Sequence, residues 1–176
     1  MTDTQATTVG PGTAVGAGPV RRVYIHDVAA PKATAVVPSV FVAARDDRGR
    51  LLLVRRADSG AWELPGGRVD VGESMREAGV RETVEESGVL VRITGVAGLF
   101  TDPGHVVVDP SGTEVRQQFV VCLRARAVRG VPVPDLVETI EAAWFDPAVV
   151  GTLRTEPGAG LWIPWVLSGG RDTHLD

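Results

Sequence analysis

The sequence predicts an α/β fold in which one mixed β-sheet is packed between helices. Its apolar segments read in order as strands, a helix, further strands and a second helix, and this order fits a sheet covered on both faces. The chain has 176 residues, of which 44% are hydrophobic, so it can bury one sizeable core. A single globular domain is therefore expected.

Composition divides the chain into four parts. Residues 1–20 are rich in Thr, Ala and Gly and show no hydrophobic period, so we expect a disordered tail. Residues 21–32 are expected to form an arm or a short strand, residues 33–168 the folded domain, and residues 169–176 a C-terminal tail. The folded domain thus covers most of the chain.

The strands are predicted from apolar runs that end at turn residues. Residues 36–44 and 51–55 are apolar, and Asp46-Asp47-Arg48-Gly49 between them has the composition of a turn, so the two runs read as a hairpin. Pro110-Ser111-Gly112 marks a second turn. Further strands are expected at residues 90–100, 105–108, 115–126 and 142–145.

The first helix is expected over residues 74–87. Ser74 and Glu77 have the Ser-x-x-Glu spacing of a capping box, and Gly88 suits the turn that ends a helix. The face expected to pack against the sheet carries Val80, Thr83 and Val84.

A closing helix is expected over residues 162–167, packed through Trp162 and Trp165. Cys122 is the sole cysteine of the sequence and lies in an apolar run, so we expect a buried thiol that forms no internal disulfide.

Three carboxylates are expected on one face of the first helix. Glu82, Glu85 and Glu86 stand at positions i, i+3 and i+4, and like charges at these spacings destabilise an isolated helix. An external cation would relieve that repulsion, and Mg²⁺ prefers oxygen ligands together with substrate phosphates. The cluster therefore indicates a metal site for a polyphosphate or diphosphate substrate; the alternative is a solvated acidic helix face.

The spacing around this cluster resembles a known family motif. From Gly67 to Val89 the chain reads Gly-x5-Glu-x7-Arg-Glu-Thr-Val-Glu-Glu-Ser-Gly-Val, which is similar to the Nudix box. Thr83 departs from the pattern because it stands where the box has an apolar residue. The resemblance implies an α/β/α sandwich and a hydrolase that splits the pyrophosphate linkage of a nucleoside diphosphate joined to another group.

The resemblance also implies roles for individual residues. Glu85 and Glu86 would be direct ligands of Mg²⁺, with Mn²⁺ as a possible substitute, and Gly67 would contribute its backbone carbonyl. Glu82 would be either a further ligand or the general base. Arg81 and Glu73 would orient the cluster through charge-assisted hydrogen bonds.

Candidate substrate contacts lie outside the motif. Trp62 is expected either to stack on a base or to fill the core, and Arg116 leads into an apolar strand at the expected cleft. Glu138, with Glu141 as the second choice, is the candidate for an additional acidic residue. Pro103 falls near a proline that ADP-ribose hydrolases of the family carry, although Pro-Gly is also an ordinary turn.

The substrate class stays open between two readings. The segment Leu64-Pro65-Gly66-Gly67 is closer to members that cleave nucleoside triphosphates, which we slightly prefer, whereas Pro103 favours ADP-ribose or a nucleotide sugar. A third possibility, from a different functional class, is a nucleotide sensor that has the same fold and does not turn its ligand over.

Charge and hydropathy bear on partners and location. The formal net charge of −4 offers no electrostatic footprint for sequence-independent binding of nucleic acid. No apolar run is long enough to cross a membrane, and residues 1–20 do not resemble a signal peptide, so a cytoplasmic protein is expected. A homodimer paired through residues 21–32 is a further expectation.

Overall fold

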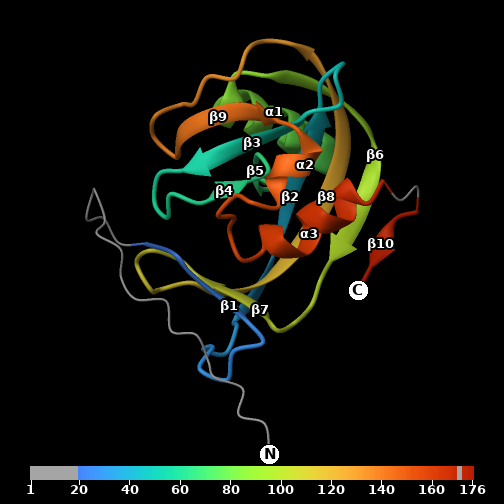
Figure 1. Cartoon of the computed structure of the whole chain (residues 1–176). Helices are drawn as coiled ribbons and strands as arrows, with labels where there is room; N and C mark the ends of the chain where they lie inside the picture. Colours follow the sequence, from blue (N-terminus) through green and yellow to red (C-terminus); the bar gives the residue numbers. More distant parts are fainter. Residues whose placement is uncertain (1–19, 170–171) are drawn as a thin grey trace, which may run out of the picture.

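The computed structural model describes residues 20–169 and 172–176, and the described strands form a single mixed sheet (Figure 1). The expected tail over residues 1–20 lies outside this description apart from Val20. The strands are β1 (Arg22–Ile25), β2 (Ala35–Arg45), β3 (Leu51–Arg56), β4 (Trp62–Glu63), β5 (Gly66–Arg68), β6 (Leu90–Phe100), β7 (His105–Val108), β8 (Val115–Arg129), β9 (Thr139–Phe145) and β10 (His174–Leu175).

The central strands β2 and β8 pair in parallel from Ala35↔Arg116 to Arg45↔Arg126. On its other side β8 pairs antiparallel with β6 and β7, so the sheet is mixed as predicted. The predicted hairpin partners β2 and β3 meet through the register pair Arg45↔Leu51, and β5 then takes the place beside β2. This exchange of partners sets β5 and its glycines next to the middle of β2.

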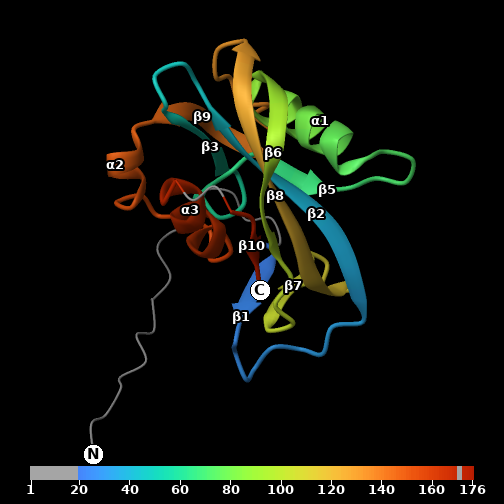
Figure 2. The ribbon, with the colours of Figure 1, turned by 90° about the vertical axis from the view of Figure 1, so that its right-hand side faces the viewer.

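Helices cover both faces of the sheet, which confirms the predicted sandwich (Figure 2). Helix α1 (Met75–Ser87) packs on one face, and α2 (Pro147–Val150) and α3 (Ala159–Leu167) pack on the other. On the α3 side, Trp162 is 1% exposed and stacks on Phe41 with ring centroids 4.9 Å apart. Trp165 is partly buried and donates from Nε1 to the Ala97 carbonyl, and Cys122 is buried in the same core.

Helix α1 begins and ends as the sequence predicts, but its buried face differs. Ser74 is the N-cap of a complete capping box with Glu77, and Gly88 ends the helix with a left-handed φ of 67°. Val84 is exposed, contrary to prediction, because small residues face the sheet instead. A Cβ on Gly79 would lie 2.9 Å from Leu123 Cδ1, so the helix packs closer than a valine face would allow.

Both ends of the described chain join the sheet. The arm expected over residues 21–32 contributes β1, which pairs antiparallel with β7 of the same chain, from Arg22↔Val108 to Ile25↔His105. Within the expected C-terminal tail, β10 pairs in parallel with β6. No helix in the described part of the chain is long and apolar enough to span a membrane.

Candidate active site

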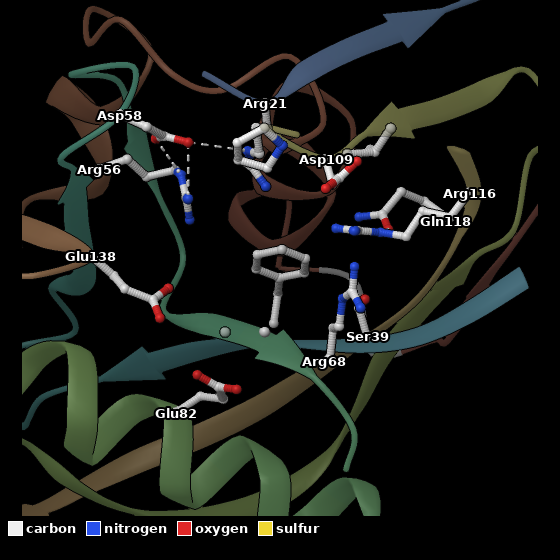
Figure 3. Close-up of a pocket in the computed structure, with 15 residues that line it drawn as sticks. Arg21, Ser39, Arg56, Asp58, Arg68, Glu82, Asp109, Arg116, Gln118 and Glu138 are labelled. Atoms are coloured by element: carbon white, nitrogen blue, oxygen red, sulfur yellow. Dashed lines mark hydrogen bonds and ion pairs between the residues drawn. The ribbon is translucent and has the colours of Figure 1, made fainter. Parts of the chain in front are cut away.

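A cavity of about 340 Å³ lies where β5 and α1 meet the central strands β2 and β8 (Figure 3). Glu82 and Glu138 point into it from one side, and the guanidinium groups of Arg68 and Arg116 lie on the other side. The lining consists of Arg21, Ser39, Phe41, Arg56, Asp58, Gly66, Gly67, Arg68, Glu82, Val107, Asp109, Pro110, Arg116, Gln118 and Glu138.

The guanidinium group of Arg81 organises the acidic face of α1. It binds Glu73 through two nitrogens, at 2.6 and 3.1 Å, and this hydrogen bonding lowers the pKa of the Glu73 carboxyl. Its Nη1 donates to Glu82 at 2.9 Å and to Glu85 at 3.2 Å, and its Nη2 donates to the Arg68 carbonyl. One cation therefore orients three carboxylates and ties them to β5.

Glu82 is held against the backbone of Gly67. A Cβ at Gly67 would lie 2.4 Å from Glu82 Oε1, so a glycine is what allows this approach. Burial raises the pKa of Glu82, and the negative charges of Glu85 and Glu138 add to this effect while Arg81 opposes it. The charge of Glu138 therefore helps to raise the pKa of Glu82, although Glu138 comes from the loop before β9.

Glu86 is buried beneath the acidic face, with 3% of its surface exposed. Its carboxylate accepts a hydrogen bond of 2.9 Å from the Gly66 amide, and its backbone carbonyl accepts one from Thr139 Oγ1. Burial raises the pKa of Glu86 to about 8. The side chain thus links α1, β5 and β9 and sits where a cation would stabilise its charged form.

Whether these residues fit a divalent cation depends on the arrangement of their oxygens. Within residues 20–169 and 172–176, no three His, Cys, Asp or Glu side chains converge closely enough to hold a metal ion. The reason is that Arg81 holds Glu82 and Glu85 while Glu86 turns to Gly66. The chemistry of the possible ligands nevertheless fits a divalent cation, because all of them are oxygen atoms. Burial raises the pKa of Glu86, so a nearby positive charge would stabilise its ionised form.

Two of the four predicted substrate contacts line the cavity and two do not. Arg116 and Glu138 line it, and so does Gln118, two residues beyond Arg116. Trp62 instead packs edge-on against Phe145, with ring centroids 4.7 Å apart, and Pro103 is exposed in the turn between β6 and β7. An apolar partner on β9 accounts for Trp62, since aromatic pairs stabilise a core.

Sequence reasoning named Arg116 of the cationic wall but missed Arg21, Arg56 and Arg68. Arg21 reaches in from the arm, 2.8 Å from Glu156 and 3.1 Å from Glu63. Arg56 binds Asp58 through two nitrogens, at 2.9 and 3.1 Å. No local motif marks these residues, although a basic residue at the end of an apolar strand, as at Arg56, was a signal that could have been followed.

Arg21 pairs with Glu63, a carboxyl group that is buried beside the cavity. Burial raises the pKa of Glu63 to about 7, although the charges of Arg21 and Arg56 oppose the shift. Arg21 therefore binds the arm to β4 through a buried ion pair beside the cavity.

The chain is similar to known proteins in sequence and in fold. Residues 36–166 match the model of the family described as NUDIX domain. The chain is 40% identical over 67 residues to the MutT-like protein of Streptomyces ambofaciens, a match that covers 38% of this chain and 43% of that protein. It is 33% identical over 75 residues to the ADP-ribose pyrophosphatase of Methanocaldococcus jannaschii, covering 41% and 43% respectively.

The chain thus spans less than half the length of these curated relatives, whereas the likeness in fold is more extensive. The crystal structure of an ADP-ribose pyrophosphatase from Streptococcus suis superposes with a TM-score of 0.63 at 23% identity, over 80% of this chain and 98% of that one. Since the family model covers most of the sequence, including the whole motif from Gly67 to Val89, the chain belongs to the NUDIX domain family.

Proposed function

We propose that this protein is a metal-dependent hydrolase that cleaves the pyrophosphate linkage of a nucleoside diphosphate joined to another group, with a nucleoside triphosphate as the preferred substrate. The observation that carries the proposal is the cavity itself. Glu82, fixed by Arg81 beside Gly67, faces a wall of guanidinium groups across a space that suits a small ligand.

Divalent metal is assigned to the acidic face of α1. Glu85, Glu86 and the Gly67 carbonyl would hold Mg²⁺ or Mn²⁺, with Glu82 beside them. A bound Mg²⁺ lowers the pKa of water and neutralises charge on the phosphate oxygens.

The chain's own side chains supply positioning and proton transfer. Glu82 lines the cavity, whereas Glu85 and Glu86 do not. We therefore assign Glu82 the role of the general base that accepts the proton of the attacking water. Arg81 and Glu73 position it through their hydrogen bonds. Arg68 and Arg116 on the opposite wall are placed to bind phosphate oxygens, for which guanidinium groups have the right geometry.

The choice of a triphosphate rests on the number of cations and on the position of Pro103. Arg21, Arg56, Arg68 and Arg116 all line the cavity, which suits a ligand with several phosphate groups. Pro103, the basis for an ADP-ribose reading, does not line it. The relative from Methanocaldococcus jannaschii, named as an ADP-ribose pyrophosphatase, keeps that substrate as the second candidate.

The first test is product release from nucleoside triphosphates (canonical and oxidised), ADP-ribose, nucleotide sugars and dinucleoside polyphosphates, with Mg²⁺, with Mn²⁺ and with chelator. Metal-dependent cleavage of triphosphates is the expected result. Cleavage of ADP-ribose instead would overturn the substrate preference alone. Nucleotide binding without any cleavage would replace the hydrolase with a sensor.

The second test is Glu85→Gln, which should lower kcat at least about 10²-fold, the range for positioned acid–base groups, while the chain stays folded. Glu141→Gln is the matched control, because Glu141 is exposed, pairs with Arg55 and does not line the cavity. Full turnover by Glu85→Gln would contradict the assigned role.

A further inference from the structure

A second cavity, of about 370 Å³, lies at the far end of the same central strands. Its cationic lining comprises Arg45 on β2 and Arg124 and Arg126 on β8. Thr94 of β6 and Val166 of α3 also belong to the lining, as do Ala43, Ala125 and Gly169. No carboxylate belongs to the described lining, in contrast to the first cavity, which is lined by both carboxylates and guanidinium groups.

The two cavities share a sheet face but are well separated. Alternate residues of a strand face the same side, so Ser39 of the first cavity and Arg45 of the second lie on one face of β2. Six residues of strand separate them, which is about 20 Å. Helix α3 lies between, because Trp162 stacks on Phe41 while Val166 lines the second cavity.

Strand register brings the cationic side chains together. Arg45 and Arg126 are direct partners in the parallel β2–β8 pair, and Arg124 stands opposite Ala43 two positions earlier. Adjacent strands are about 4.8 Å apart, so the two partnered arginines leave the sheet side by side. Like charges at this spacing repel one another unless an anion lies between them.

Among the described residues, the contacts that Arg45 and Arg126 make do not offset the repulsion between these two side chains. Arg45 donates to the backbone carbonyls of Gly49, at 2.9 Å, and Val166, at 3.2 Å, and Arg126 donates to the Asp46 carbonyl at 3.5 Å. These acceptors are neutral, and the Asp46 carboxylate itself is bound by Arg50 at 2.7 Å. Burial lowers the pKa of Arg45, and the charge of Arg126 lowers it further.

We propose that this second cavity binds a small anion bearing a diphosphate group, at a site separate from the candidate active site. Guanidinium groups bind phosphate oxygens through paired hydrogen bonds, and the partnered Arg45 and Arg126 present two of them side by side at the cavity. The volume lies in the range of small-molecule sites. The proposal concerns binding alone and does not depend on the proposed hydrolase activity.

The experiment is a titration of the full chain with inorganic pyrophosphate in the presence of chelator, followed by backbone amide NMR. Saturable shifts are expected at Thr94, Arg126 and Val166. Shifts at Gly66 and Gly67 report on the first cavity separately. A second titration uses ADP in place of pyrophosphate. If ADP and pyrophosphate bind with equal affinity, the diphosphate group is the feature recognised. If ADP binds more tightly than pyrophosphate, the nucleoside is recognised as well.

Arg126→Gln should weaken pyrophosphate binding at the second cavity about tenfold, as expected for loss of one charge-assisted hydrogen bond. Arg126 is exposed and its described contact is long, so the variant should fold. Arg129→Gln is the control, since Arg129 is exposed on the same strand and lines neither cavity. An absence of saturable shifts, or equal weakening by both variants, would overturn the proposal.

Discussion

Gly67→Ala tests whether the contact between β5 and Glu82 sets the catalytic geometry. The new methyl group would lie 2.4 Å from Glu82 Oε1 and 2.6 Å from Cδ, whereas ordinary contacts begin at 3.4 Å. The carboxylate must therefore move by about 1 Å. A misplacement of that size costs about 10²-fold in rate, equivalent to about 2.7 kcal/mol of activation free energy.

Stability should change little in this variant. Gly67 does not have a positive φ, so alanine is sterically allowed on the backbone, and the atoms in the way belong to the end of a flexible side chain. We expect the free energy of unfolding to change by less than about 1 kcal/mol.

The assay is kcat with Mg²⁺ on the substrate that the panel identifies, alongside urea denaturation. Gly160→Ala is the matched control, because nothing lies within 4 Å of a Cβ there. A folded Gly67→Ala variant with unchanged kcat would refute the reasoning, since Glu82 would then tolerate displacement.

Three further outcomes concern stability. Ser74→Ala removes the N-cap of α1 and should lower the free energy of unfolding by about 1 kcal/mol in urea denaturation; an unchanged midpoint would show that Glu77 and packing suffice. Trp162→Ala leaves a hole beside Phe41 and should cost about 3–5 kcal/mol, read from the same curves, and a smaller loss would mean that α3 collapses onto the sheet. Burial lowers the pKa of His105 from 6.5 to about 4, so the unfolded chain binds a proton before the folded one does as pH falls. Up to about 3 kcal/mol of stability, present above pH 6.5, should be lost between pH 6.5 and 4, and His105→Gln should flatten that slope.

The sequence allowed strands to be predicted far more accurately than their partners. The bounds of β6 and β7 agree with the predicted ranges residue for residue, since apolar runs and turn residues mark them locally. The predicted β2–β3 hairpin is correct at its turn, but β5 replaces β3 beside the middle of β2. That exchange depends on distant packing and leaves no local signal.

The same contrast between local and distant signals holds for Trp162 and Trp62. Trp162 was predicted to be a core residue and is one, because it lies in a continuous apolar helix. For Trp62 the sequence allows two interpretations, stacking on a base or packing in the core. Its contact with Phe145 places it against the core. Its partner is on β9, whose position beside β3 could not be read from the residues around Trp62.

The sequence by itself determined helix α1, its caps and the spacing of Glu82, Glu85 and Glu86, because capping and i, i+4 contacts involve residues within one turn of each other. Only the tertiary structure decided what faces that helix across the cavity. Arg21 meets Glu156, which is 135 residues away, through the order in which strands pair. Side-chain convergence of this kind follows from sheet topology and register, which local sequence patterns do not encode.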